Sequence, residues 1–304
     1  MKWKKLGLIY VPDGTRWWAR SYATLPTADL LNDGNIRVYF ASLDENRFGR
    51  IGYIDLDAND PQRILYETKE PILDLGDLGT FDDSGVNPSC VLNVAGKKYL
   101  YYVGWQRCAR VPYMLFAGLA IGNDDGTPFV RALRTPVLDR TDEEPFLRSA
   151  AAIIFESGVF KAWYVSGLRW TYVNGDQYPC YVIKYADSTD GLNWSCYPHV
   201  CINFENQDEF GFGRPWVVKE HSLYRMWYSI RSKTAPYRIG YAESSNGLTW
   251  ERRDEEAGIY RSEDGWDSQM ICYPCVVDVK GRRLMFYNGN RHGLTGFGCA
   301  VLEP

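Results

Sequence analysis

Carboxylic residues gather in four loops of the sequence, each directly before a short apolar segment. The loops are "FDDSGVNPS", "DEEPFLRS", "NQDEFGFGRP" and "EDGWDSQMICYP". Two carboxyl groups from different loops suit general acid–base chemistry, in which one donates and the other accepts a proton. We expect Asp83, Glu144 and Asp267 to be catalytic, with Asp82 in contact with the substrate. The alternative is that these acids pair with nearby arginines and serve only the fold.

Arginine recurs where the apolar segments begin. When the segment starts are aligned, the equivalent residues are Arg20, Asn87, Arg148, Arg214 and Tyr273. Cations brought together repel one another unless an anion lies between them, and guanidinium groups suit carboxylate and phosphate. The alignment therefore predicts an anionic substrate: a sugar phosphate, a nucleotide sugar or an acidic sugar. In the alternative interpretation, each arginine pairs with a neighbouring Asp or Glu.

Aromatic and basic residues follow the second apolar segment of several units. Trp105 suits stacking on the face of a sugar, and Arg169, Arg231 and His292 occupy corresponding loops. These four complete the expected substrate-binding set. Calcium prefers several oxygen ligands, and a single histidine without acidic partners does not supply them. We therefore expect neither a metal ion nor another cofactor.

The elements that must position these residues are repeated strands. The doublet "WY" at 163–164 returns at 227–228, with looser copies "VYF", "LYYVG" and "MFYNG". Five copies follow at a period of about 55–65 residues, each with short strands split by Gly, Asn and Asp turns. Four strands per unit, repeated radially, define a β-propeller. The sequence thus predicts an all-β, five-bladed β-propeller, with blades at approximately 14–66, 82–134, 144–198, 209–253 and 267–304.

The last copy lacks a fourth strand, whereas the chain begins with a spare one. We expect residues 6–11 to pair with the last blade and close the ring, because an unpaired edge strand is unfavourable. Residues 1–304 then form a single domain.

The closing motifs "YADSTDGLNW" and "YAESSNGLTW" resemble those of five-bladed carbohydrate-active propellers, such as glycoside hydrolase families 43 and 32 and the family 130 phosphorylases. The resemblance covers the whole chain and implies an active site in a funnel on the central axis. In family 43 a base Asp, a helper Asp and an acid Glu come from the first, second and third blades. Here Asn87 stands at the helper position, and Arg20 and Arg148 lie near the other two, so the usual acid triad is absent.

The resemblance implies a glycoside hydrolase-like enzyme of carbohydrate or polysaccharide metabolism that acts on an anionic or activated sugar. Two alternatives stay open. A phosphorylase would use arginine side chains to hold inorganic phosphate, and a non-catalytic propeller would bind carbohydrate without turnover.

Composition narrows the cellular context. The net charge is −4, and no basic run exceeds "KWKK", so we expect no nucleic-acid partner. No apolar stretch is long enough for a membrane span, and no signal peptide is predicted. Eight cysteines, several within apolar segments, are typical of a reducing compartment. We therefore expect a cytoplasmic location.

Overall fold

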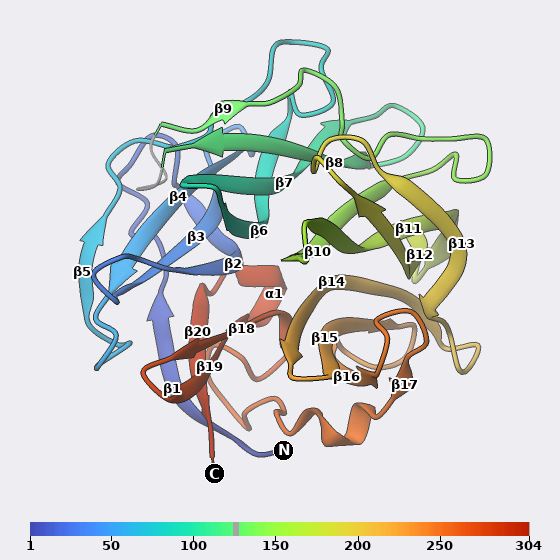
Figure 1. The fold of residues 1–304 in the computed structure, drawn as a ribbon. Helices are drawn as coiled ribbons and strands as arrows, with labels where there is room; N and C mark the ends of the chain where they lie inside the picture. Colours follow the sequence, from blue (N-terminus) through green and yellow to red (C-terminus); the bar gives the residue numbers. More distant parts are fainter. Residues whose placement is uncertain (124–127, 304) are drawn as a thin grey trace.

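The computed structural model describes residues 1–123 and 128–303 and is almost entirely β-structure (Figure 1). The helices in this part of the chain are one short α-helix, α1 (Asn290–Gly293), and one 3-10 helix (Asp254–Ala257). The predicted all-β class is confirmed. No helix among the described residues is long and apolar enough to cross a membrane.

The strands follow one another in antiparallel groups. The first group comprises β2 (Ser21–Leu30), β3 (Ile36–Leu43), β4 (Gly49–Leu56) and β5 (Ile64–Glu67). The second comprises β6 (Gly85–Val94), β7 (Lys97–Arg107), β8 (Tyr113–Gly122) and β9 (Val130–Arg131). The third comprises β10 (Arg148–Glu156), β11 (Val159–Val173), β12 (Asp176–Ser188) and β13 (Ser195–Ile202). The fourth comprises β14 (Glu209–Glu220), β15 (Leu223–Ser232), β16 (Arg238–Ser244) and β17 (Glu251–Arg252).

The last group joins the two ends of the chain. It contains β18 (Cys272–Val279), β19 (Arg282–Asn288) and β20 (Phe297–Leu302), and β1 (Trp3–Tyr10) pairs antiparallel with β20. In this pairing Trp3 lies opposite Leu302, and Tyr10 lies opposite Phe297.

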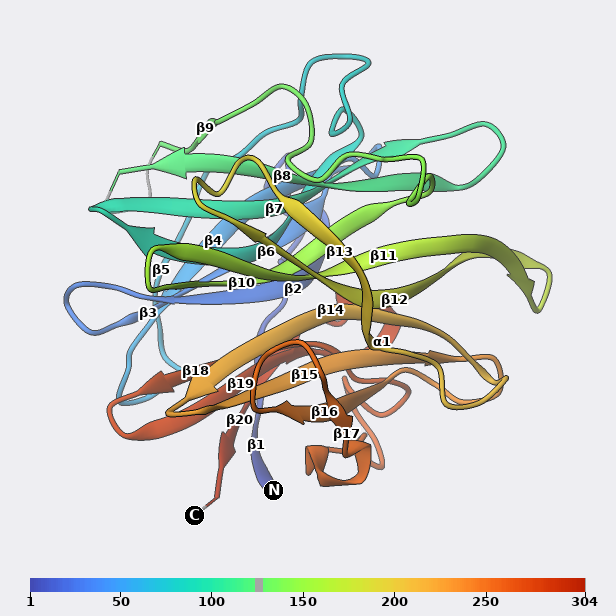
Figure 2. The same cartoon turned by 45° about the vertical axis from the view of Figure 1, so that its right-hand side comes forward.

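The first strand of each group lies nearest the centre of the molecule (Figure 1). β2 contacts β6, β6 contacts β10, β10 contacts β14, β14 contacts β18, and β18 contacts β2. Figure 2 shows the β7–β8 and β11–β12 hairpins projecting from one side of the molecule. Helix α1 lies beside the inner end of β2, which it contacts.

The repeated closing motifs are turns that fasten one group to the group before it. In the first turn Ser188 and Asp190 accept hydrogen bonds from following backbone amides, and Ser244 and Asn246 do the same in the second. The carbonyl of Gly191 accepts a 2.9 Å hydrogen bond from Tyr101 of β7. The motif therefore serves packing between sheets.

Candidate functional site

A cavity of about 280 Å³ lies where the first strands meet. Every first strand contributes at least one residue to its wall. The lining residues are Leu25, Asn87, Val103, Trp105, Tyr113, Leu115, Ser149, Ala150, Val165, Tyr181, Gly213, Arg214 and Tyr273. Arg214 is the charged residue among them, and no carboxylate belongs to this set.

Bulges in the first strands shape the wall. In β14 the pairing with β15 skips from Gly213 to Trp216, and β2, β10 and β18 carry corresponding bulges. The equivalent residues in these bulges have left-handed backbone angles: φ is 54° at Leu25, 48° at Ala150, 50° at Arg214 and 57° at Tyr273. Such angles are costly for residues other than glycine and cluster at functional sites.

The bulges also correct the sequence alignment at two positions. Leu25 and Ala150, rather than Arg20 and Arg148, occupy the positions equivalent to Arg214 and Tyr273. Arg20 is exposed, and its Nη1 donates a 2.6 Å hydrogen bond to the carbonyl of Gly14. The cavity thus receives one of the three arginines that were expected to converge there.

Aromatic side chains form much of the cavity wall. Trp105 packs where Gly85 leaves room, because a Cβ on Gly85 would lie 2.1 Å from the indole Nε1. Tyr113 and Tyr181 come from β8 and β12, and burial raises the pKa of Tyr113 to about 12. Flat aromatic faces with polar edges suit the alternating apolar and hydroxyl surfaces of a sugar.

Arg231 is a buried cation beside this wall. It is 4% exposed, and its Nη1 donates a 2.8 Å hydrogen bond to the hydroxyl of Tyr181. Its guanidinium carbon lies within 5.5 Å of four ring centroids, those of Tyr178, Tyr181, Phe210 and Tyr237. Among the described residues no carboxylate pairs with it, and its buried Nε has no hydrogen-bond partner.

Arg214 is the second buried arginine at the cavity. It is 1% exposed and bridges three first strands. Nη1 donates to the carbonyl of Pro274 at 2.6 Å, and Nη2 donates to the carbonyl of Pro26 and to Oγ1 of Thr27. Burial lowers its pKa. The partners of Arg214 in the described structure are neutral, so its charge is not cancelled by a carboxylate.

His292 stands close to these groups, on the left-handed turn inside α1. Its ring centroid lies 4.9 Å from that of Tyr237 and 6.2 Å from that of Tyr273. Part of the His292 side chain is exposed to solvent, yet desolvation by the surrounding protein, followed by the charge of Arg231, lowers its pKa to about 4. The imidazole is therefore neutral near pH 7.

Three of the acids singled out in the sequence lie in one recurring structural arrangement. Each accepts a hydrogen bond from a tyrosine 20 residues later on the second strand of its group: Asp82 from Tyr102, Glu144 from Tyr164 and Asp267 from Tyr287. Each is also paired with a cation, namely Arg131, Lys184 and Lys5 respectively, at 2.6 to 2.8 Å. None of the three lines the cavity.

Glu144 has the most partners of these acids. Arg148 pairs with it at 2.9 Å, and Ser166 donates a 2.6 Å hydrogen bond to it. Burial alone would raise the pKa of Glu144, but hydrogen bonds from Lys184 and Ser166 and the charge of Arg148 outweigh burial and lower its pKa. For Glu144 and Arg148 this geometry matches the ion-pair alternative that the sequence left open.

The remaining predicted residues are dispersed. Asp83 is half-buried and accepts hydrogen bonds from the amide of Gly79 and the hydroxyl of Ser84. Asn87, Trp105, Arg214 and Tyr273 line the cavity. Arg169 is exposed and lines a neighbouring hollow. No group of three or more His, Cys, Asp or Glu residues in the described part of the chain is arranged to hold a metal ion.

Sequence reasoning missed the tyrosines around Arg231. Tyr113, Tyr178, Tyr181 and Tyr237 come from β8, from β12 and from the loop before β16. All four lie at or near the start of the third strand of a group: Tyr113 begins β8, Tyr178 and Tyr181 lie early in β12, and Tyr237 directly precedes β16. This shared position is the signal that the sequence offers.

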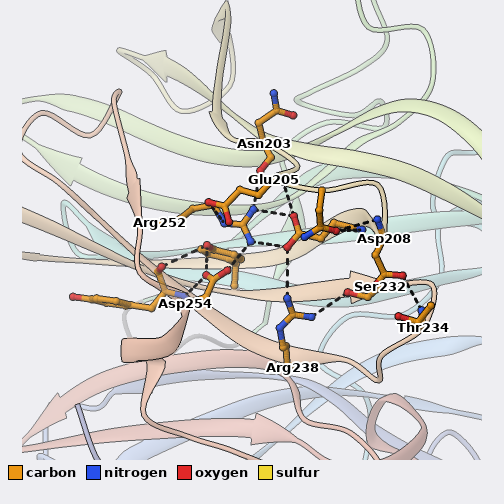
Figure 3. Close-up of polar contacts among 12 residues, drawn as sticks. Asn203, Glu205, Asp208, Ser232, Thr234, Arg238, Arg252 and Asp254 are labelled. Carbon is orange, nitrogen blue, oxygen red and sulfur yellow. Dashed lines mark hydrogen bonds and ion pairs between the residues drawn. The ribbon is translucent and has the colours of Figure 1, made fainter.

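A further charged cluster lies around Glu209, at the start of β14 (Figure 3). Arg252 donates to both carboxylate oxygens of Glu209, at 2.9 and 2.7 Å, and pairs with Asp254 at 2.5 Å. Arg238 pairs with Glu209 at 3.5 Å. The cluster joins β14, β16 and β17 and leaves no unpaired charge on Glu209.

Comparison with solved structures assigns this architecture to a class. The chain is similar to a glycoside hydrolase (TM-score 0.76, 17% identity, 99% of this chain and 92% of that one). It is also similar to a thermostable family-43 glycoside hydrolase (TM-score 0.68, 18% identity, 92% and 89% covered). A third similar structure belongs to the GH130 family of mannoside phosphorylases, which contains glycoside hydrolases that target β-1,2 mannosidic linkages (TM-score 0.75, 14% identity, 99% of this chain and 94% of that one). The fold is that of the propeller glycoside hydrolases.

Two curated relatives define the family more closely. The chain is 40% identical over 303 residues to the uncharacterized proteins Rv1502 and MT1551 of Mycobacterium tuberculosis, with complete coverage of both partners in each comparison. The chain therefore belongs to the same family as these two proteins. No protein-family model matches it.

Proposed function

We propose that residues 1–304 form a single five-bladed propeller, with each antiparallel group as one blade. The cyclic contacts from β2 through β6, β10, β14 and β18 back to β2 support the blade count. The pairing of β1 with β20 supports closure of the ring by the N-terminal strand, which supplies the outer strand of the last blade.

The central cavity binds a carbohydrate that carries negative charge. The observation on which this proposal rests is Arg231, a guanidinium buried among aromatic rings, beside the cavity and without a carboxylate partner in the described structure. A buried charge is costly unless it is paired, so an anionic ligand supplies the missing counter-charge. Arg214 adds a second uncompensated charge at the cavity wall. The aromatic lining supplies surfaces for the sugar ring.

The residues of this cavity fit carbohydrate binding better than hydrolysis by two carboxylates. That mechanism requires an acid and a second carboxylate on either side of the scissile bond. The lining contains neither, and Glu144 and Asp267 are held by tyrosine and cation partners. Asp83, which is half-buried, stays the acid candidate for an enzymatic alternative in which the glycosyl group is transferred to phosphate.

Binding and turnover can be separated in one assay series. Neutral and anionic monosaccharides are titrated into the protein by calorimetry, and aryl glycosides are incubated with and without inorganic phosphate. We expect saturable binding of an anionic sugar, lost in Trp105→Ala, with no product released. Hydrolysis abolished by Asp83→Asn would overturn the recognition proposal in favour of an enzyme, and turnover that requires phosphate would identify a phosphorylase.

A further inference from the structure

A second hollow of about 340 Å³ lies beside the central cavity, between the hairpin of β11 and β12, the start of β14 and the end of β15. Arg169, Cys180, Phe210 and Lys233 are among the residues that line it. We call this hollow the cationic groove.

Arg231 packs against one wall residue of the groove and one of the cavity. Its guanidinium carbon lies 4.7 Å from the ring centroid of Phe210, on the groove wall, and 5.3 Å from that of Tyr181, on the cavity wall. Arg169 lies opposite Cys180 in the pairing of β11 with β12, and Cys180 and Lys233 both line the groove.

The carboxylate that lines the groove is already paired. Glu209 is the carboxylate of its lining, and Arg252 and Arg238 bind that carboxylate (Figure 3). In the described structure Arg169 and Lys233 form no ion pair, and Nζ of Lys233 donates a 2.5 Å hydrogen bond to the carbonyl of Gln207. The groove therefore presents two cations without a counter-ion, Arg169 and Lys233, and Arg231 lies behind the ring of Phe210.

The position of these cations identifies where the ligand carries its charge. A carboxylate on the sugar ring would lie inside the cavity, where both Nη atoms of Arg214 already bind protein oxygens. A phosphate attached to the ring through an ester oxygen extends away from it, and three oxygens can accept bonds from several cations at once. We infer that the ligand is a phosphate-bearing saccharide, with its ring in the cavity and its phosphate in the cationic groove. This inference rests on the proposed carbohydrate site.

The test compares ligands that differ only in their charged group. Methyl glycosides of glucose, galactose and mannose are titrated beside the corresponding 1-phosphates and uronic acids. The proteins are the intact chain, Arg169→Ala/Lys233→Ala, and the control Lys97→Ala, which removes an exposed lysine on β7. We expect one 1-phosphate to bind at least about tenfold more tightly than its methyl glycoside, and this advantage to vanish in the double variant only.

The other outcomes separate the two proposals. Equal affinity for a methyl glycoside and its 1-phosphate would overturn the groove assignment and leave the carbohydrate site intact. Preferential binding of a uronic acid, unaffected by the double variant, would also overturn it. If no sugar binds, the carbohydrate proposal fails, and the phosphorus NMR signal of inorganic phosphate tests the groove alone. Broadening by the intact chain but not by the double variant supports an anion site there, and absence of broadening excludes one.

Discussion

The hydroxyl of Tyr287 on β19 donates a 2.9 Å hydrogen bond to Oδ2 of Asp267, which also pairs with Lys5 of β1 at 2.6 Å. One carboxylate thus joins the loop before β18 to the second strand of its group and to the N-terminal strand. Tyr164 with Glu144 and Tyr102 with Asp82 repeat the relationship. The repeated acids of the sequence therefore hold each loop against its own sheet.

The stability of Asp267→Asn tests this structural role. The substitution removes the buried carboxylate charge that pairs with Lys5. We expect it to lower the free energy of unfolding by about 1–3 kcal/mol. Urea unfolding followed by tryptophan fluorescence measures the change. Asp264→Asn, at an exposed carboxylate three residues earlier, is the matched control and should change stability by less than about 0.5 kcal/mol. Unchanged stability in Asp267→Asn would contradict the role.

The lowered pKa of Glu144 leads to a prediction for how the stability of the fold depends on pH. Its pKa in the folded protein lies below the ordinary value of 4.5. A lowered carboxyl pKa contributes stability that is present above the unfolded value and is lost as the pH falls through the folded value. We expect the intact chain to lose stability as the pH drops below about 4.5. Urea unfolding over a pH series should show a shallower acid dependence for Glu144→Gln, and parallel curves would contradict the prediction.

The sequence predicted the repeating strands well because their signals are local. The aromatic doublets and the Gly and Asn turns lie within a few residues of one another, and they mark β7, β11, β15 and β19 directly. The site was harder to predict because it depends on register. The cavity-lining residues are Leu25 and Ala150, which lie after Arg20 and Arg148 in bulged parts of β2 and β10, and no local pattern in the sequence marks those bulges. The aromatic rings around Arg231 come from separate groups, for example Tyr178 on β12 and Tyr237 before β16, and no local sequence pattern joins them.

Gly85 leaves the space that the indole of Trp105 occupies, and Gly85 itself is not part of the cavity lining. A methyl group on Gly85 would lie 2.1 Å from the indole Nε1 and 2.2 Å from Cε2, so the ring must move in Gly85→Ala. We expect weaker binding of the sugar, by about 1 kcal/mol or more, as for loss of a stacking contact. Calorimetry with the ligand found for the intact chain measures this. Trp105→Phe keeps a ring in place and should bind more tightly than Gly85→Ala; the reverse order would contradict the role of Gly85.

His292 should stay neutral at the pH at which the protein binds its ligand. Desolvation by the surrounding protein and the charge of Arg231 lower its pKa to about 4, so the imidazole gains a proton only in acid. Carbon-detected NMR of the histidine rings should show this titration, and Arg231→Met should raise the pKa because it removes a neighbouring cation. A titration of His292 near its ordinary value of 6.5 in the intact chain would contradict the packing around Arg231.

The thiols provide a test of the packing as a whole. All eight cysteines are free; Cys108 and Cys196 are exposed, whereas Cys90, Cys180, Cys201, Cys272, Cys275 and Cys299 are buried. Burial raises the pKa of Cys90 and of Cys201 to about 12, and thiolate is the reactive form. A thiol reagent such as Ellman's reagent should therefore modify two cysteines rapidly in the folded protein and all eight in denaturant. Although Cys196 is exposed, partial desolvation of its thiol raises its pKa, and the guanidinium of Arg148 contacts its sulfur, so Cys108 should react first. Cys108→Ser removes the faster phase if the assignment is correct, and an unchanged fast phase would contradict it.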